Sequence, residues 1–269
     1  MQTPASELWV IKIGGAMVDD AAAARSLLRQ VRECVAAGIR VVLVHGGGQR
    51  LTSVAERLGH TSTFVGGRRV TDAGMIEVAK LVFAGGVGTD LAAVAHGEGV
   101  RAVALSGVAA GLLQVQRRPP RNGVDFGWVG DVTAVDPKVL LALTSNGFVP
   151  MVASLGVDDD GLVYNVNADT VACAIAVGLR ASRLMVMTAL DGVLLDPSDP
   201  QSRVPRLNIS TIRSGCLDFA ISGGMIPKLE SLAAAREQGV GQVLLASWHH
   251  PDGLTSWIHA ESPYGTQLV

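Results

Sequence analysis

The strongest constraint on the fold is the alternation of short apolar runs and helical stretches at the start of the chain. Residues 9–15 (WVIKIGG) form a β-branched run that two glycines end, and residues 21–38 follow with apolar residues at helical spacing. Residues 39–48 (IRVVLVHGGG) form a near-continuous apolar run, typical of a strand buried on both faces, and a second helical stretch follows. This order with short connections predicts parallel strands joined by right-handed crossovers.

The alternation continues through the chain with one interruption. The apolar spacing predicts a helix over residues 74–97 and then a strand over 100–107. Residues 112–135 alternate between apolar and polar and contain an Asn-Gly pair, which predicts an antiparallel hairpin. A buried strand restarts the pattern at residue 182, and no low-complexity linker separates the two halves. Two lobes that share one sheet therefore fit the sequence better than two tethered domains.

Composition excludes several classes of protein. Hydrophobic residues make up 48% of the chain and charged residues 17%, which excludes a disordered chain. The formal net charge of −2 gives no electrostatic footprint for nucleic acid or for an anionic membrane. Because no apolar run approaches the roughly 18 residues of a membrane span and the start lacks a signal sequence, we expect a soluble, cytoplasmic protein. Cys34, Cys173 and Cys216 lie far apart, which predicts reduced structural thiols.

Glycine is in excess, and its clusters lie where apolar strands end or helices begin. The chain has 32 glycines, and the clusters are Gly14-Gly15, Gly46 to Gly48 and Gly223-Gly224. A backbone without Cβ atoms approaches a phosphate closely, and free N–H groups at a helix start point at its charge. A tight strand-to-helix turn is the better explanation of any one cluster alone, but three together weaken it and favour an anion-binding site. Their spacing matches neither Walker A nor G-x-G-x-x-G, which disfavours those nucleotide-binding modes.

Lysine is scarce, because the 22 basic residues include only four lysines. Lys12 ends the first predicted strand just before the first glycine cluster, and Lys228 follows the third cluster in the first turn of a predicted helix. In a chain that otherwise uses arginine, a lysine in such a place suggests a compact positive charge for a bound anion. A solvated or paired lysine is the alternative at each position. Lys80 and Lys138 lack these surroundings, and we expect them at the surface.

Two further segments concentrate polar side chains. Asn165, Asn167 and Asp169 recur at every second position between a strand and a helix, so an extended segment would project all three to one side. Two amides and a carboxylate can hold a polar ligand and orient ammonium groups, whereas a capped helix would need only one of them, Asn167 or Asp169. Arg68 and Arg69 precede a Val-Thr-Asp sequence, and arginine is a natural bidentate partner of a carboxylate. A surface position is equally compatible with Arg68.

The sequence shows no pattern that is typical of nucleophilic catalysis. The sequence has no Ser/His/Asp order and no paired carboxylates, and the six histidines are scattered. His45 comes at the end of a predicted strand, directly before three glycines. We interpret it as a packed, hydrogen-bonded histidine rather than a base.

Six segments between residue 10 and about residue 240 resemble, in order and spacing, the amino acid kinase family. They are IKIGGAM, VVLVHGGG, GRRVTD, DFGWVGDV, NVNAD and SGGMIPKLE. Each segment alone is a weak signal, but the ordered set is specific. It favours the branch that acts on N-acetyl-L-glutamate over the aspartate, glutamate 5-, uridylate and carbamate kinases.

The resemblance implies an α/β fold, an open three-layer αβα sandwich around a mainly parallel central sheet, in two lobes. Residues 1–179 would form the N-terminal lobe, which binds the acyl amino acid and dimerises. Residues 180–269 would form the C-terminal lobe, which binds ATP. The implied reaction is ATP-dependent phosphorylation of the γ-carboxylate of N-acetyl-L-glutamate in arginine biosynthesis.

The resemblance also implies a role for each matched residue. Lys12 and Lys228 would neutralise the phosphoryl group in transit, and Asp169 would organise the two ammonium groups. The substrate would contact Gly47, Gly48, Arg69, Asn165 and Asn167, with Arg69 on its α-carboxylate. ATP and its phosphates would contact Gly14, Gly15, Thr188, Asp191, Gly224 and Met225. Mg²⁺ would be carried by the ATP phosphates without a protein metal site, and the ionised γ-carboxylate would need no base.

The chain departs from the family's pattern near both ligands. The family usually has an acidic residue after Thr188, where this chain has Ala189, so either Asp191 compensates or ATP binding is weakened. On the substrate side, residues 106–111 and the pair Val87-Gly88 differ from the usual S-G-x-D-G and V-N. The residues after about 245 are the part that the resemblance covers least.

The sequence and the resemblance also lead to an expectation about the oligomeric state. Few residues precede the first strand, and arginine-inhibited relatives form hexamers through an N-terminal helix, so we expect an arginine-insensitive homodimer.

One alternative function is the related kinase of lysine biosynthesis, which acts on an α-aminoadipate derivative, free or attached to an acidic carrier protein. The basic residues Arg117, Arg118 and Arg121 would suit such a carrier. A second alternative is a non-catalytic, kinase-like regulatory subunit, which the retained Lys12 and Lys228 argue against.

Overall fold

The computed structural model describes residues 7–196, 198–215, 225–258 and 264–269. At its centre is an eight-stranded sheet, and neighbouring strands in it are parallel except for one antiparallel pair, β15 with β16. From edge to edge the order is β14 (Arg206–Leu207), β16 (Thr266–Leu268), β15 (Gln242–Ser247), β11 (Arg183–Thr188), β1 (Leu8–Ile13), β2 (Arg40–His45), β8 (Val149–Ala153) and β5 (Ala102–Ser106). The predicted mainly parallel sheet is confirmed.

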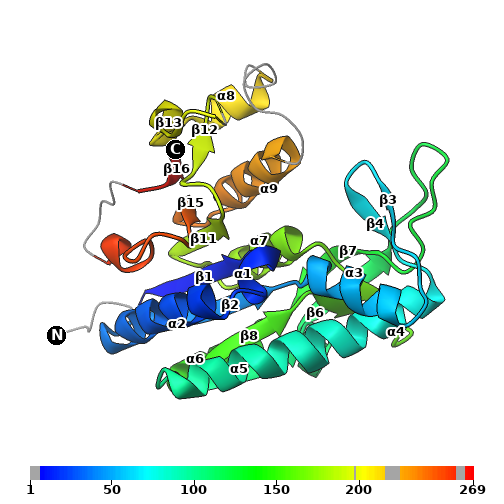
Figure 1. Ribbon diagram of the computed structural model, residues 1–269. Coiled ribbons are helices and arrows are strands. Elements are labelled where there is room, and N and C mark those ends of the chain that lie inside the picture. The colour runs from blue at the N-terminus through cyan, green and yellow to red at the C-terminus, as the bar shows by residue number, and fades with distance from the viewer. Residues whose placement is uncertain (1–6, 197, 216–224, 259–263) are drawn as a thin grey trace.

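Helices cover both faces of this sheet, which gives the three layers of the expected α/β sandwich (Figure 1). One face packs on α2 (Ala21–Ala36), α4 (Ala73–Lys80), a π-helical segment (Leu81–Val87) and α5 (Gly88–Gly97). The other packs on α6 (Lys138–Ser145), α7 (Ala168–Gly178) and α9 (Met225–Glu237). Every residue of β1 is buried, with Trp9 and Ile11 in the first core and Val10 in the second. This two-sided burial explains why the strand is a continuous apolar run.

The remaining elements lie around the central sheet. Short helices are α1 (Gly15–Val18), α3 (Gly48–Arg57) and α8 (Ile209–Arg213), and 3₁₀ turns span Ala109–Gly111, Pro200–Ser202 and Thr255–Trp257. A second sheet has the order β10 (Val163–Asn165), β9 (Leu155–Val157), β6 (Leu113–Arg117) and β7 (Gly130–Val135). Because β6 and β7 pair antiparallel, the hairpin predicted at 112–135 is confirmed. Two small hairpins join β3 (Thr63–Val65) to β4 (Arg68–Val70) and β12 (Val193–Leu194) to β13 (Arg203–Val204).

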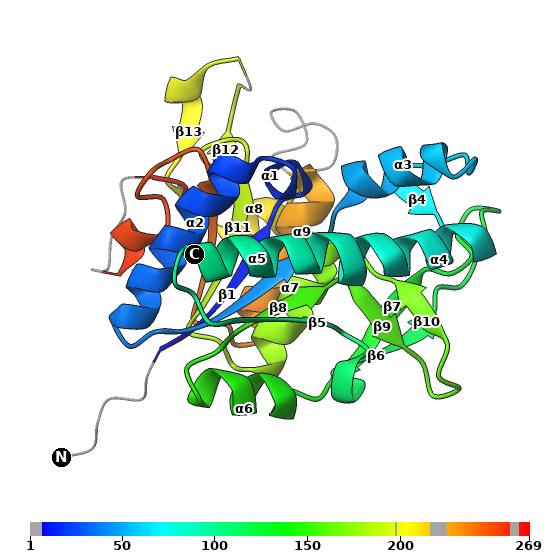
Figure 2. The ribbon, with the colours of Figure 1, turned by 60° about the horizontal axis from the view of Figure 1, so that its bottom comes forward.

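The structure corrects the expectation that no segment approaches a membrane span. The continuous helix from Ala73 to Gly97, which combines α4, the π-helical segment and α5, is long and apolar enough to cross a membrane by length and composition alone. It runs across one face of the sheet (Figure 2), where Val78, Val82 and Leu91 are buried in the core. A buried core helix passes the same test of length and composition, and the packing of this helix explains its apolar character.

The C-terminal residues extend the sheet beyond β1. In Figure 1 the yellow to red elements gather at one end of the molecule, and the blue to green elements form the rest. The first strand, β1, separates the two groups, because β11 pairs with one of its edges and β2 with the other. The carboxyl ends of β1, β2 and β11 therefore lie side by side, at the edge of the sheet where open α/β folds bind their ligands.

Candidate active site

Three charged side chains from distant parts of the chain meet at the carboxyl end of β1. Lys12 lies near the end of β1, Asp169 in the first turn of α7, and Lys228 in the first turn of α9. The Lys12 Nζ lies 2.9 Å from Oδ1 of Asp169, and the Lys228 Nζ lies 2.5 Å from Oδ2. One carboxylate thus holds two ammonium groups, each through a different oxygen. We call Lys12, Asp169 and Lys228 the Lys-Asp-Lys triad.

The surroundings keep the carboxylate of Asp169 ionised between two lysine side chains. Burial raises the pKa of Asp169, but the charges of Lys12 and Lys228 outweigh burial and hold this pKa below its usual value. Burial and the nearby Lys228 lower the pKa of Lys12, and the contact with Asp169 opposes them only in part. The carboxylate is therefore ionised at neutral pH. Because one carboxylate faces two lysine side chains, this arrangement is suited to a further anion.

Local structure turns Asp169 toward the lysines. The side-chain oxygen of Asn167 accepts hydrogen bonds from the backbone N–H groups of Asp169 and Thr170, at 2.9 and 3.1 Å. Asn167 is therefore the N-cap of α7, as the sequence allowed. Because this cap satisfies the first turn of the helix, the carboxylate of Asp169 remains available to the two ammonium groups.

Two of the three glycine clusters meet beside the triad. Gly15 follows β1 and Gly46 to Gly48 follow β2, and an ideal Cβ on Gly15 would lie 3.8 Å from the backbone nitrogen of Gly48. Gly47 has a φ of +147°, and a Cβ there would press against Val87 and Phe83, so the position requires glycine. It precedes α3, whose start has no side-chain cap. The free N–H groups of this helix start thus border the triad.

A cleft of about 400 Å³ opens next to these groups. It is lined by the triad, Gly15 and Gly46 to Gly48, and its other walls include Phe64, Arg68, Arg69, Asn165 and Asn167. The predicted acyl-substrate residues Gly47, Gly48, Arg69, Asn165 and Asn167 therefore all lie in one cleft with the predicted catalytic residues. Residues that are far apart in the sequence converge there because their strands and helices end at the same edge of the sheet.

Arg69 is fixed by several contacts. Its guanidinium donates hydrogen bonds to Ser62 Oγ (2.6 Å), Thr52 Oγ1 (2.7 Å) and the carbonyl of Gly48 (2.9 Å), and it stacks over the ring of Phe64 at 4.5 Å. The β3–β4 hairpin is thereby joined to α3 across the cleft mouth. A guanidinium held in this way keeps Nε–H and one Nη1–H in fixed directions as donors for a carboxylate.

Asn165 and its neighbours form the opposite wall. The side-chain N–H of Asn165 donates to Oγ1 of the buried Thr71 at 3.2 Å, and its backbone N–H donates to the carbonyl of Trp128. This pairing leaves the side-chain carbonyl of Asn165 able to accept a hydrogen bond from a ligand in the cleft.

Sequence reasoning missed part of the cleft wall. Arg118 is 8% exposed and lines the cleft together with Val129 and Ser154. It donates two hydrogen bonds to Oδ1 of Asp131, at 2.6 and 2.9 Å. The sequence predicts Arg118 as part of a basic rim for an acidic carrier. Strand alternation gives no signal for its burial, because Arg118 is out of phase with the buried Leu113 and Val115.

His45 also lies against this region. It is fully buried, its Nδ1 lies 3.1 Å from the carbonyl of Gly46, and burial lowers its pKa to about 4. The interpretation as a packed, hydrogen-bonded histidine is confirmed. Among the described residues no partner contacts its Nε2, and within the same residues no group of three or more histidines, cysteines or carboxylates could hold a metal ion.

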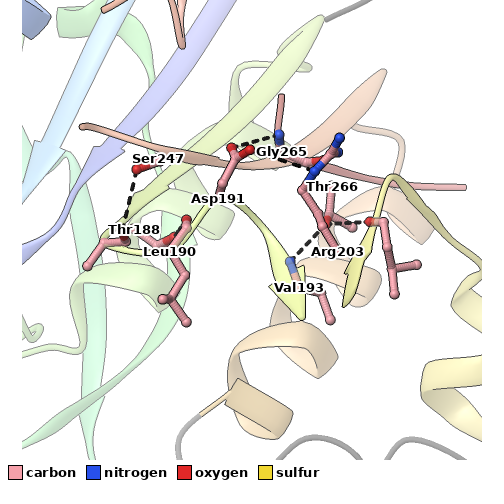
Figure 3. Close-up of polar contacts among 10 residues, drawn as sticks. Thr188, Leu190, Asp191, Val193, Arg203, Ser247, Gly265 and Thr266 are labelled. Carbon is pink, nitrogen blue, oxygen red and sulfur yellow. Dashed lines mark hydrogen bonds and ion pairs between the residues drawn. The ribbon is translucent and has the colours of Figure 1, made fainter. Parts of the chain in front are cut away.

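Of the residues predicted for ATP that the structure describes, Gly15 alone lines the cleft. Gly14 packs under the ring of Trp248. The Thr188 hydroxyl donates to the carbonyl of Leu190 at 2.6 Å, and the Asp191 carboxylate turns toward Gly265 and Arg203 (Figure 3). Met225 is half-buried at the start of α9, and Gly224 lies outside the described residues. Gly14, Thr188, Asp191 and Met225 thus lie outside the cleft lining.

Comparisons with known proteins agree with this geometry. Residues 7–247 match the model of the amino acid kinase family. The chain is similar to acetylglutamate kinases of Symbiobacterium thermophilum (38% identity, covering 97% of this chain and 90% of the relative) and of Myxococcus xanthus (40%, covering 97% and 88%). Its fold is similar to N-acetylglutamate synthase from Neisseria gonorrhoeae, with a TM-score of 0.84 and 24% identity over 98% of this chain and 59% of the synthase. The chain belongs to the amino acid kinase family.

Proposed function

We propose that this chain is a kinase that uses ATP to phosphorylate the γ-carboxylate of N-acetyl-L-glutamate, giving N-acetylglutamyl 5-phosphate and ADP, a step of arginine biosynthesis. The observation that carries the proposal is the Lys-Asp-Lys triad at the end of a cleft that contains Arg69 and Asn165. Relatives named acetylglutamate kinase, similar over nearly the whole chain, support the same reaction.

In this proposal the cleft holds the acceptor. Arg69, already oriented by Ser62 and Thr52, binds the α-carboxylate through its remaining N–H donors. Asn165 and Asn167 contact the acetylated amino group with their side-chain amides. The γ-carboxylate then extends toward the triad, past the backbone N–H groups that follow Gly47. A cleft of about 400 Å³ is of the size that small metabolites occupy.

The transfer itself needs positive charge rather than a base. An oxygen of the γ-carboxylate attacks the γ-phosphorus of ATP, and the bond between that phosphorus and the bridging oxygen breaks, which releases ADP. Lys12 and Lys228 stabilise the charge on the phosphoryl oxygens, and Asp169 keeps the two ammonium groups in place. The γ-carboxylate is already ionised at pH 7, so no proton has to be removed from it. The neutral, buried His45 is not required.

The nucleotide in this proposal approaches from the β11 side of β1. Residues 180–269 bind ATP through Thr188, the loop that contains Asp191, Gly224 and Met225. Gly14 and Gly15 of the N-terminal lobe contact its phosphates, which carry Mg²⁺. Residues 1–179 bind the acceptor and form the contact of a homodimer in the cytoplasm. Light scattering tests the assembly, because a hexamer, or inhibition by millimolar arginine, would contradict an arginine-insensitive dimer.

The lysine-pathway alternative loses support in its carrier-bound form. Arg117 pairs with Asp125 at 2.8 Å, and Arg118 pairs with Asp131 inside the cleft wall. Of the three basic residues that would suit an acidic carrier, Arg121 alone has no ion-pair partner among the described residues. The basic rim is thus largely neutralised by its own hairpin.

The direct test traps the acyl phosphate with hydroxylamine in the presence of MgATP. Hydroxamate formed from N-acetylglutamate and not from N-acetylaminoadipate is the expected result. Product from the aminoadipate derivative alone would point to lysine biosynthesis, and the absence of product with both would point to a regulatory subunit. The Lys228→Ala variant is the negative control, and Lys138→Ala, an exposed lysine paired with Asp136, is its matched positive control.

A further inference from the structure

Four residues join the loop after β11 to the last strand of the chain (Figure 3). Oδ1 of Asp191 accepts a hydrogen bond from the backbone N–H of Gly265 at 2.9 Å, and its Oδ2 lies 3.7 Å from Nε of Arg203. Arg203 in turn donates to the carbonyl of Gly265 at 2.6 Å, so both backbone polar groups of this glycine are held. Thr266 Oγ1 accepts from the N–H of Val193 (2.8 Å) and donates to the carbonyl of Val204 (2.6 Å). We call Asp191, Arg203, Gly265 and Thr266 the C-terminal latch.

Close backbone packing reinforces the latch. Gly192 and Gly265 both have positive φ, +93° and +83°. A Cβ on Gly192 would collide with Thr266, and a Cβ on Gly265 would collide with the carbonyl of Leu245. The loop of residues 189–192 therefore contacts the last strand through main chain as well as through the carboxylate of Asp191.

This loop begins at the same edge of the sheet as the triad. Thr188 ends β11, and Val186, two residues earlier, pairs with Lys12 in β1. A Cβ on Gly14 would lie 3.2 Å from the carbonyl of Met187. Because Gly46 to Gly48 follow β2 and Ser154 follows β8, the acceptor part of the cleft lies on the opposite side of β1 from β11. The loop is therefore on the side that the proposed function leaves for the phosphoryl donor.

The exposed part of the loop offers a ligand its backbone rather than charged side chains. Ala189 and Leu190 are exposed and uncharged, and their carbonyls accept hydrogen bonds from the hydroxyls of Ser247 and Thr188. The carboxylate of Asp191 is turned into the latch. Recognition through backbone groups depends on the loop conformation, because these groups cannot reorient independently as side chains do.

We infer that Asp191 is a positioning residue, which through the C-terminal latch holds residues 189–192 in the conformation that binds the nucleotide of the phosphoryl donor. The inference rests on the proposed ATP-dependent function. It gives Asp191 an indirect role, in place of the direct contact that would compensate for Ala189.

The test measures nucleotide binding without an acceptor. Isothermal titration of MgATP into Asp191→Ala and Arg203→Gln should give a dissociation constant raised about tenfold, the effect of one lost charge-assisted hydrogen bond. The double variant should lose little more than either single variant, because the two residues act through one latch. Asp191→Asn keeps an oxygen acceptor for Gly265 and should retain most of the affinity. The dissociation constant for N-acetylglutamate should stay within about twofold of wild type in all variants.

A matched control separates the latch from general loosening of this part of the chain. In the same part of the chain, Oε2 of Glu237 lies 2.6 Å from Nη2 of Arg213 in an exposed ion pair. Glu237→Gln breaks this pair and should leave MgATP binding unchanged. Wild-type MgATP affinity in Asp191→Ala would overturn the inference, as would an Asp191→Asn variant as weak as Asp191→Ala, since that indicates a direct charge contact. Equal losses for MgATP and N-acetylglutamate would overturn it as well.

The binding assay also separates this inference from the proposed function. If wild type forms no hydroxamate while Asp191→Ala still weakens MgATP binding, the proposed acceptor is wrong and the latch stands. If wild type forms hydroxamate and the latch variants bind MgATP normally, the latch alone is refuted.

Discussion

The two sides of β1 use their polar residues in opposite ways. On the β2 side, Lys12, Arg69 and Asn165 face a cleft, and each keeps hydrogen-bonding capacity for a ligand. On the β11 side, Thr188 and Asp191 direct their side chains to their own chain. The first side is organised to bind through side chains, whereas the second presents backbone whose conformation is set by distant contacts.

This contrast separates two kinds of sensitivity to mutation. On the cleft side, a substitution removes a group that touches the acceptor or the phosphoryl group, so we expect its effect in kcat or in the KM for the acceptor. On the loop side, substitutions act through conformation and should appear in nucleotide binding. Among the cleft residues, we expect the effects of substitution to decrease from the triad to Arg69.

The largest effect should come from the triad. Lys12→Ala should lower kcat roughly 10³-fold, because it removes charge stabilisation that is needed as the phosphoryl group transfers. The KM for MgATP should change much less. Steady-state kinetics with the exposed Lys80→Ala as control checks this, and a Lys12→Ala enzyme with normal kcat would remove the basis for the catalytic assignment.

The second-largest expected effect is a loss of folding stability at acidic pH, caused by the buried His45. His45 has a folded pKa of about 4 against 6.5 for the free side chain, so the unfolded chain binds the extra proton first as the pH falls. The contribution of the neutral His45 to the free energy of unfolding is fully present above pH 6.5. About 3 kcal/mol of this free energy should be lost as the pH falls from 6.5 to 4. Urea unfolding across this range measures the loss.

A control variant isolates the contribution of this histidine. His45→Gln should unfold more easily at pH 7 but show a flatter dependence on pH, whereas replacement of the exposed His96 should leave the slope unchanged. The same slope in His45→Gln and wild type would mean that other groups carry the acid sensitivity.

Arg69 should have a smaller effect, confined to the acceptor. Arg69→Lys keeps the charge but loses the planar donor edge, and it should raise the KM for N-acetylglutamate about tenfold with little change for MgATP. Arg57→Lys, on an exposed part of α3, is the control. Equal changes in both KM values would indicate that the hairpin contacts of Arg69, rather than acceptor binding, explain the result.

The smallest effect should come from the surface hairpin. Arg117→Ala should leave both KM values within about twofold of wild type, because this arginine forms an exposed pair with Asp125. A large, salt-dependent loss of activity toward a carrier-linked acceptor would instead revive the carrier alternative.

Much of the cleft could be predicted from sequence because strand ends and helix starts carry local signals. Lys12 precedes glycines that stop a strand, and Asp169 follows a helix cap, so their positions on the sheet edge follow from the order of elements. A mainly parallel sheet then brings such ends together. The sequence left open whether Asn167 or Asp169 caps the helix, because both types of side chain can do so.

The direction of loop side chains could not be predicted in the same way. Asp191 turns toward Gly265, which lies 74 residues further along the chain and directly precedes β16. Arg118 turns into the cleft wall because Asp131 lies across the hairpin from it. The long helix from Ala73 to Gly97 differs from the helix predicted over residues 74–97, because residues 81–87 are π-helical. Its apolar face is determined by packing on the sheet.

The central place of β1 has a consequence for the order of folding during synthesis. β1 leaves the ribosome before its neighbours β2 and β11, and its second edge pairs with β11, where Val10 meets Leu184. Until β11 emerges, this strand, apolar except for Lys12, has one open edge, a template for wrong pairing with other chains. The nascent chain is therefore most exposed to aggregation before residue 188 is made, and completing the second half ends that risk.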